Sequence, residues 1–519
     1  VQTCAAEKRR RRKKGTLEDP AKRLFINDAV CEGCGDCSVK SNCLSVIPKE
    51  TELGRKRQID QSSCNKDYSC ANGFCPSFVS VIGGTLRKPD GAGGDVDTLF
   101  DPLPEPVLPS LDKPWNTVVT GVGGTGVLTI TALVAMAAHI EGKGCATMNQ
   151  TGLAQKFGAV VSHVRVSASQ DDIKAVRIPA GEADLLLGCD LVVTSTYEAL
   201  GKVARGRTHA VVNDAEVPTS AFILDPDARF PTAAMKSKGS DEAGAAATFF
   251  IDSTRIATQL LGDSIGSNLF LLGYAWQQGL VPVSAAALAE AIELNGVAVR
   301  FNKEAFLWGR RCAHQPQRVL ALVDAVAPQA PVRLQSFEDI VSDRSARLTE
   351  YQNAAYAGQY RQQVERVRAA DPRAGEADSI SVAVARNLFK LMAIKDEYEV
   401  ARLYSDGEFL RKLERQFEGD YELRFHMAPP LFSKRDPHTG HLLKQEFGPW
   451  MLRAFGVLAR LRFLRGSALD VFGRTAERRR ERADLEQYLA LLEQPRWNWY
   501  ACRPGCAGLA TSRTATASC

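Results

Sequence analysis

The stretch TVVTGVGGTGVLTITALVAMAAHI, residues 117–140, joins a short β-branched run, a group of glycines and a long apolar run. Residues 117–120 predict a strand, because β-branched side chains fit a pleated, buried surface. Residues 127–140 predict a helix, and the glycines between them predict the tight turn by which a buried strand enters a helix. This strand-turn-helix unit favours an α/β fold for the central part of the chain.

The same alternation of strand-like and helix-like runs continues from Trp115 to about Arg311. Further strands are expected at 145–149, 184–194 and 209–213, and helices at 252–276 and 285–294. We therefore predict an α/β domain with a mostly parallel sheet.

Composition changes on both sides of this domain, and 519 residues are too many for one hydrophobic core. Beyond Pro331 strands fade, and amphipathic segments such as 337–369 and 380–402 predict helices. The fold class is thus multidomain, α+β and α/β. The expected segments are a start with a basic run at 1–22, a small cysteine-rich module at 23–86, a linker at 87–114, the α/β domain at 115–330, a helical C-terminal domain at 331–494 and a disordered or artefactual tail at 495–519.

Charge and hydropathy exclude some classes of protein. A formal charge of +5 is small for this length, so the whole molecule has no field of the kind that binds nucleic acid. The most apolar stretch, 127–140, falls short of the roughly 20 residues that a membrane span needs. We expect a soluble, cytoplasmic protein without a membrane partner.

Seven of the fourteen cysteines lie between Cys31 and Cys75. In a large chain with no export signal, this clustering favours metal ligation over disulfides. Cys31, Cys34 and Cys37 form C-x2-C-x2-C, and Pro76 follows Cys75, which is how bacterial-type ferredoxin folds bind cubane clusters. Because the last cysteine of each run ligates the other cluster, these four thiols are assigned to one [4Fe-4S] cluster.

A second cluster would take Cys43, Cys64 and Cys70, which leaves it one ligand short. Residues 64–70 have the pattern C-x2-D-x2-C, so Asp67 is the candidate fourth ligand. A carboxylate is a harder donor than a thiolate, and the cluster should therefore be labile and convertible to [3Fe-4S]. Cys4 is the competing candidate, outside the module.

A structural zinc site is the alternative interpretation of these cysteines. Zinc sites usually pair two separated C-x2-C units or combine one with histidine, whereas this module has a triple run and no histidine. Gly33, Gly35 and Gly73 would let the backbone fold tightly around a cluster and direct N–H groups at its sulfurs. Ordinary turns explain these glycines equally well.

The glycines of residues 121–126 follow the pattern G-x-G-x-x-G, which permits close approach of a phosphate or of another chain segment. A dinucleotide site also needs an acidic residue about 20 positions further on, but the second predicted strand ends in Met148-Asn149-Gln150, so NAD binding is disfavoured. The alternative is helix-strand packing alone. The candidate cofactor-binding residues are Gly121, Gly123, Gly124, Gly126, Asn149, Gln150, Thr151 and Gly152.

Several of these stretches resemble fused indolepyruvate ferredoxin oxidoreductases, of the 2-oxoacid:ferredoxin oxidoreductase family. The ferredoxin segment of that family is similar to residues 25–28, 31–37, 41–43, 61–67 and 73–78. Its gamma domain is similar to residues 115–311, notably 121–126, 149–152 with Gln155 and Gly158, 163–165, and Phe306 with Gly309-Arg310. The helical tail resembles its C-terminal domain.

The resemblance implies oxidative decarboxylation of an aryl 2-oxoacid with thiamine diphosphate and Mg²⁺, coenzyme A taking the acyl group and ferredoxin the electrons. The family's thiamine-binding Gly-Asp-Gly sequence does not occur in this chain, and residues 1–14 look like the end of that missing domain. The chain is therefore expected to relay electrons through two clusters without decarboxylating alone. By resemblance, residues 150–165 help to close the substrate or coenzyme A site, with plain domain packing as the alternative.

The expected partners are ferredoxin, the 2-oxoacid, coenzyme A and thiamine-diphosphate domains of the same longer chain or of a companion chain, in an oligomer. Two rival functions remain open at this point. The basic run at 8–14 could belong to a nucleic-acid-binding module, although without interleaved aromatics it suits a solvated connector or a patch that steers an acidic ferredoxin. The second rival is an electron-transfer subunit coupled to a dinucleotide-binding or flavin-binding domain.

Overall fold

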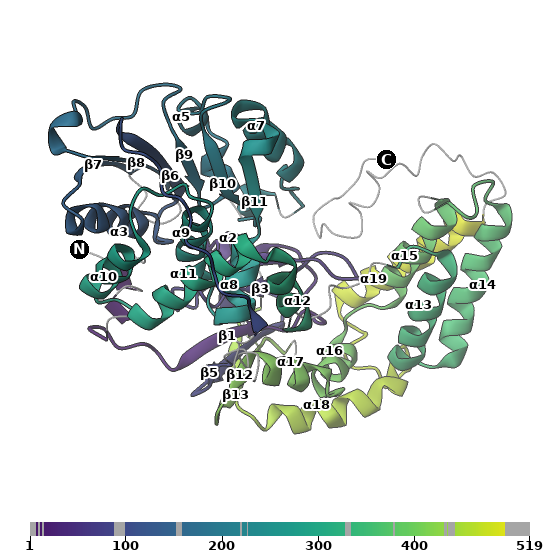
Figure 1. Ribbon diagram of the computed structural model, residues 1–519. Coiled ribbons are helices and arrows are strands. Elements are labelled where there is room, and N and C mark those ends of the chain that lie inside the picture. The colour runs from purple at the N-terminus through teal and green to yellow at the C-terminus, as the bar shows by residue number, and fades with distance from the viewer. Residues whose placement is uncertain are drawn as a thin grey trace. The chain divides into compact units, whose positions relative to one another are not determined.

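The structure is a computed structural model that describes residues 7–8, 11–12, 15–87, 99–151, 158–217, 221–225, 227–326, 334–376, 379–429, 433 and 442–493. The chain forms two compact units (Figure 1). The first unit comprises residues 1–20, 61–65 and 87–329, and the second comprises 21–60, 66–86 and 330–519. The tail predicted at 495–519 and part of the basic run lie outside the described residues.

The first unit is built on a six-stranded sheet. Its order is β11 (Thr248–Ile251), β10 (His209–Asn213), β9 (Leu185–Gly188), β6 (Trp115–Val122), β8 (Ala159–Ser167) and β7 (Gly144–Thr151). Only β8 runs against the other strands of this described sheet, because it pairs antiparallel with both β6 and β7. The prediction of a mostly parallel sheet is confirmed.

Helices cover both faces of this sheet (Figure 1). Along β6, Val119 packs with α3, α9 and α10, whereas Val118 packs toward α4 and α7, as the alternation of side chains along a strand requires. The helices of this unit are α3 (Val127–Ile140), α4 (Leu191–Thr194), α5 (Tyr197–Leu200), α6 (Ala221–Leu224), α7 (Thr232–Ala243), α8 (Ser253–Leu261), α9 (Ser267–Gln277), α10 (Ala285–Asn295), α11 (Val299–His314) and α12 (Pro316–Val326).

The prediction for residues 127–140 is confirmed, since α3 has these bounds. The predicted strand at 184–194 is wrong in its second half. β9 ends at Gly188, and residues 191–194 form α4. The physical reason is Asp190, whose side chain accepts the Val193 N–H at 2.8 Å and so starts a helical turn.

Helices α9 and α11 cross in backbone contact at two glycines. A Cβ at Gly273 would stand 2.0 Å from the Phe306 carbonyl oxygen, and one at Gly309 would stand 1.9 Å from that of Phe270. Only glycine permits this approach.

The second unit contains an antiparallel sheet in the order β1 (Lys22–Ile26), β4 (Phe78–Ile82), β13 (Glu422–Met427) and β14 (Gln445–Phe447). The other strands of the unit form two small sheets, β2 (Val46–Lys49) with β3 (Lys56–Ile59) and β5 (Thr85–Leu86) with β12 (Phe417–Glu418). The expectation that strands fade beyond Pro331 is therefore wrong at β12, β13 and β14. These short strands form because the cysteine-rich segment supplies partners for β12 and β13.

Helices make up most of the C-terminal region, which confirms that part of the prediction (Figure 1). They are α13 (Phe337–Tyr351), α14 (Ala354–Ala370), α15 (Ile380–Met392), α16 (Glu397–Ser405), α17 (Glu408–Gln416), α18 (Met451–Arg460) and α19 (Ala476–Glu493), with α2 (Asp36–Ser41) in the cysteine-rich segment. α13, α14, α15 and α19 share one core, while α16, α17 and α18 pack against the four-stranded sheet. Within the described residues, none of the helices has the length and apolarity that crossing a membrane requires.

Candidate metal centre and glycine-rich loop

The first run of cysteines is held by tight turns after β1. Cys31 donates its backbone N–H to the Asn27 carbonyl at 2.9 Å, and its sulfur accepts the Gly33 N–H at 3.3 Å. Gly33 has φ +74°, and a Cβ there would lie 2.1 Å from the Arg55 carbonyl oxygen. Gly35, also in the left-handed region, precedes α2, the helix that carries Cys37. These glycines are required by the turns that bring the thiols together.

Cys75 approaches the same place from the other end of the module. The preceding segment passes so close to α2 that a Cβ at Gly73 would stand 2.9 Å from the Cys37 Cα. The Phe74 N–H donates to the Asp36 carboxylate at 2.9 Å, which fixes this approach. The Cys75 sulfur lies 3.0 Å from the Ser77 hydroxyl oxygen.

This approach places Cys75 near the first run of cysteines, and the charge of Cys75 affects the ionisation of their thiols. Burial, followed by the charge of Cys75, raises the pKa of Cys31. The same two causes raise the pKa of Cys34 to about 11 and that of Cys37 to about 12. Thiols in this environment stay protonated unless a cation compensates for the charge of the thiolates, which is what a metal does.

The candidate ligands of a second cluster are distributed differently. Cys70 is buried in the 3-10 turn Ser69–Asn72, which packs against α2, and the Cys43 N–H donates to the Ser41 hydroxyl at 3.2 Å. Asp67 is exposed, and its Oδ1 accepts the N–H and the hydroxyl of Ser69 at 3.1 and 2.8 Å. Cys64 lies in the first unit, whereas Cys43, Asp67 and Cys70 lie in the second.

The assignment of Cys43, Cys64, Asp67 and Cys70 to one cluster stays a prediction. Cys4 lies outside the described residues. Within the part of the chain that the structure describes, no three Cys, His, Asp or Glu side chains form a group that could hold a single metal ion.

The glycine-rich loop joins β6 to α3 as predicted, and its glycines have local structural reasons. A Cβ at Gly121 would meet Val127 at 2.6 Å and Cys189 at 2.8 Å, so the strand can approach the helix only without a side chain. Gly124 and Gly126 have φ of +85° and +107°. Gly123 donates its N–H to the Gly158 carbonyl at 2.7 Å. Packing explains Gly121 and backbone conformation explains Gly124 and Gly126, while the predicted role of the loop in binding a cofactor stays a prediction.

The order of the strands differs from that of a dinucleotide-binding unit. In such a unit the strand after the first helix lies beside the first strand. Here β8 lies between β6 and β7 and runs antiparallel to both. The register nevertheless places the loop and the other candidate residues at the same edge of the sheet, because Val122 pairs with Ala159 and Thr151 pairs with Val160.

The side chain of Gln150 is hydrogen-bonded to a buried histidine. The Nε2 of His163 lies 3.3 Å from the Gln150 Oε1, and its Nδ1 accepts the Ile178 N–H at 3.3 Å. Burial lowers the pKa of His163 to about 4, so the ring is neutral and its Nε2 donates to Gln150. Asn149 and Thr151 are exposed on the same strand, and Gly152 lies outside the described residues.

Sequence reasoning missed Asp190, which follows β9 at the edge where the glycine-rich loop begins. It is buried, and a Cβ at Gly121 would stand 3.3 Å from its Oδ2. Burial raises the pKa of Asp190, and neighbouring backbone N–H groups partly oppose this effect. Its position directly after the buried run Leu185–Gly188 could have identified it, because the carboxyl ends of parallel strands commonly carry functional side chains.

Comparison with known proteins gives two family matches. Residues 116–312 match the family described as pyruvate ferredoxin/flavodoxin oxidoreductase, and residues 337–501 match one described as a family of unknown function (DUF6537).

Individual relatives are similar to part of the chain. Indolepyruvate oxidoreductase subunit IorB of Pyrococcus horikoshii is 28% identical over 205 residues, 39% of this chain and 98% of that protein. IorB of Thermococcus kodakarensis is 26% identical with the same coverage. The gamma subunit of a keto/oxoacid ferredoxin oxidoreductase from Geobacter sulfurreducens is 21% identical and covers 38% of this chain and 98% of that chain, with a TM-score of 0.27.

Proposed function

We propose that the chain is the electron-transfer and gamma portion of an indolepyruvate:ferredoxin oxidoreductase, because residues 116–312 match the pyruvate ferredoxin/flavodoxin oxidoreductase family and part of the chain is similar to subunit IorB. The complete cytoplasmic enzyme would decarboxylate aryl 2-oxoacids oxidatively, form acyl-coenzyme A and reduce ferredoxin. Thiamine diphosphate and Mg²⁺ would bind to domains outside the present sequence. This chain would carry the electrons through two iron-sulfur clusters.

The observation that supports the proposal is that the two ends of the cysteine module pass side by side, where a Cβ at Gly73 would stand 2.9 Å from the Cys37 Cα. Cys31, Cys34 and Cys37 each have a pKa raised by burial and by the charge of Cys75. Four thiolates in a buried setting suit a [4Fe-4S] cluster, which would supply the compensating charge and accept one electron at a time. The Gly33 N–H at the Cys31 sulfur is the type of hydrogen bond that stabilises a reduced cluster.

The gamma-type domain would present polar side chains to the substrate or coenzyme A. Gln150, fixed by the neutral His163, lies on the strand between the exposed Asn149 and Thr151. With Oε1 engaged by the imidazole, the amide NH₂ of Gln150 is the group left to donate to a carboxylate or carbonyl oxygen. These contacts support only a polar binding role for Gln150 and its neighbours. The proposed substrate class comes from the similarity to IorB.

Iron and sulfide counting on the full chain, purified without oxygen, tests the metal centre. We expect iron and sulfide in equal amounts, and a Cys34→Ser variant that loses part of both. Cys145→Ser is the matched control, because Cys145 is half-buried in β7, outside the module. A colourless preparation, or one that holds stoichiometric zinc, would contradict the proposal.

A second experiment tests whether this chain can decarboxylate the 2-oxoacid by itself. Thiamine diphosphate, Mg²⁺, coenzyme A and indolepyruvate are added to the isolated chain, and CO₂ is measured. We expect no release, because the carbanion chemistry belongs to a cofactor bound elsewhere. Release of CO₂ at a rate above that of a heat-denatured sample would show that this chain decarboxylates by itself.

A further inference from the structure

The region matched by the family of unknown function pairs with a strand of the cysteine-rich module and forms a hydrogen bond with it. Strand β13 pairs with β4 along four residues, from Glu422 opposite Ile82 to Phe425 opposite Val79. The Tyr404 hydroxyl donates to the Pro76 carbonyl at 2.7 Å, directly after Cys75. These contacts join the C-terminal region to the last thiol of the four.

A lysine from this region lies against the first thiol. The Lys395 ammonium donates to the backbone carbonyls of Val30 and Cys31 at 3.3 and 3.1 Å and pairs with Glu32 at 2.9 Å. Its side chain is 17% exposed. The ammonium group therefore lies against the backbone of Cys31, and the half-exposed Glu32 carboxylate offsets part of its charge.

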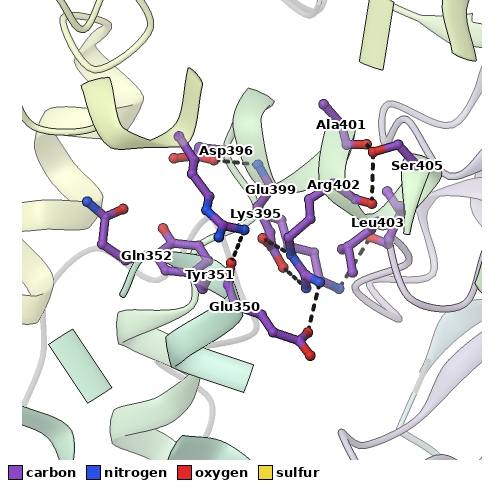
Figure 2. A network of polar contacts seen from close by, with 12 residues as sticks. Glu350, Tyr351, Gln352, Lys395, Asp396, Glu399, Ala401, Arg402, Leu403 and Ser405 are labelled. Carbon is purple, nitrogen blue, oxygen red and sulfur yellow. Dashed lines mark hydrogen bonds and ion pairs between the residues drawn. The ribbon is translucent and has the colours of Figure 1, made fainter. Parts of the chain in front are cut away.

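The position of Lys395 is fixed by a buried polar network (Figure 2). The next residue, Asp396, starts α16 by accepting the Glu399 N–H at 2.8 Å. Both oxygens of Asp396 are held by Arg465, at 2.5 and 2.8 Å, and Arg465 also donates to the Tyr351 carbonyl at 2.7 Å. The residue that follows Lys395 is thus held by its side chain at the start of α16.

A second lysine of this region contacts the later part of the cysteine-rich module. The Lys444 ammonium donates to the Ala71 carbonyl at 3.0 Å and stands 5.2 Å from the centre of the Phe78 ring. Burial lowers the pKa of Lys444, and the negative charges of Cys75 and Cys37, and more weakly of others nearby, act in the opposite direction. The ammonium group of Lys444 therefore lies beside the residue that follows Cys70 and against the first residue of β4, three positions after Cys75.

We propose that the described part of residues 337–493 sets the electrostatic environment of the iron-sulfur module. It places the Lys395 and Lys444 ammonium groups beside the cysteines and so raises the reduction potential of the cluster. Reduction adds one electron, and hence one negative charge, to the cluster. A nearby cation stabilises that added charge, the more so where water is excluded. This inference rests on the proposed function, because it requires a cluster at these thiols.

The test is a redox titration of the full chain, reconstituted with iron and sulfide without oxygen and followed by electron paramagnetic resonance. Lys444→Met and Lys395→Met remove one charge each, and Lys444→Arg keeps the charge. Exposed Arg453 on α18 supplies the matched control, Arg453→Met. We expect each lysine-to-methionine change to lower the reduction equilibrium constant roughly tenfold, about 59 mV for one electron, while Lys444→Arg and Arg453→Met leave it near the wild-type value.

Iron and sulfide content separates the possible outcomes. The inference is overturned if both methionine variants hold their full iron and sulfide and their reduction potentials equal that of the wild type. That result leaves the proposed function intact. A fall in the Arg453→Met control equal to that of the lysine variants also overturns it, because the effect would then be one of net charge. If Lys444→Met loses its cluster, Lys395→Met decides. A wild-type chain without iron refutes the proposed function itself.

Discussion

Replacing Gly73 by alanine tests the close approach on which the convergence of the thiols depends. The new methyl group would stand 2.9 Å from the Cα of Cys37 and 3.0 Å from its N and Cβ. Gly73 has φ −56° and ψ 145°, which alanine adopts freely, so the contact alone is tested. Overpacking of this kind costs about 1–3 kcal/mol, and the obstacle here is backbone, which cannot rotate away. We expect a loss of that size in the free energy of unfolding of the second unit.

The measurement uses the metal-free, reduced full chain, so that cluster binding does not mask the packing effect. Hydrogen exchange of the β4 amides in increasing urea reports the stability of the second unit. Gly358→Ala is the matched control, because Gly358 lies in α14 of the same unit and a Cβ there meets nothing within 4 Å. Alanine in an open helix position should stabilise this unit by about 0.5–1 kcal/mol.

The same change should weaken the metal centre, since Cys37 must move away from Gly73 and hence from its place beside Cys75. We expect less iron and sulfide per chain after competition with a chelator, whereas Gly358→Ala should match the wild type. A Gly73→Ala chain with unchanged stability and full iron content would refute the proposed geometry of the four thiols.

Three further changes test other parts of the structure. Gly309→Ala should destabilise the first unit by about 1–3 kcal/mol in urea unfolding, because it separates two helices in backbone contact; Gly239→Ala, where a Cβ meets one atom at 3.8 Å, should not. Lowering the pH from about 6.5 to about 4 should destabilise the same unit. The pKa of His163 is 6.5 in the unfolded chain and about 4 in the folded chain, so the unfolded chain binds more protons in this range. His163→Phe should therefore reduce the slope of stability against pH, and an unchanged slope would contradict the neutral ring. Arg465→Met should destabilise the second unit by roughly 3 kcal/mol, because Asp396 is left as an unpaired buried charge; hydrogen exchange in α16 measures this, and a neutral result would show that water replaces the arginine.

The sequence predicts local structure well where the information is local. Residues 127–140 form the predicted helix because a glycine turn and an apolar run specify its start and its length. The pattern predicts a strand through residues 184–194, but the side-chain cap of Asp190 starts a helical turn at residues 191–194.

Contacts between distant segments could not be predicted in this way. Leu423, Phe425 and Met427 alternate with less buried or polar residues, which is a strand pattern, yet the partner β4 is hundreds of residues earlier in the chain. For the same reason, spacing of the cysteines indicated the thiols but gave no sign of Lys395 and Lys444. The motif at 121–126 left helix-strand packing open as one interpretation, but the packing partners of Gly121, Val127 and Cys189, are known only from the structure.

The place of β13 in the sheet has a consequence for biosynthesis. Ser80 in β4 and His426 in β13 are 346 positions apart, yet their side chains lie 2.8 Å from each other. At ~5–20 residues per second, a ribosome needs roughly 17–70 s to make the intervening polypeptide. During that time β4 is an open edge that invites aggregation, so a nascent chain should depend on chaperones, and a product truncated before Phe417 should be insoluble rather than merely unable to hold iron.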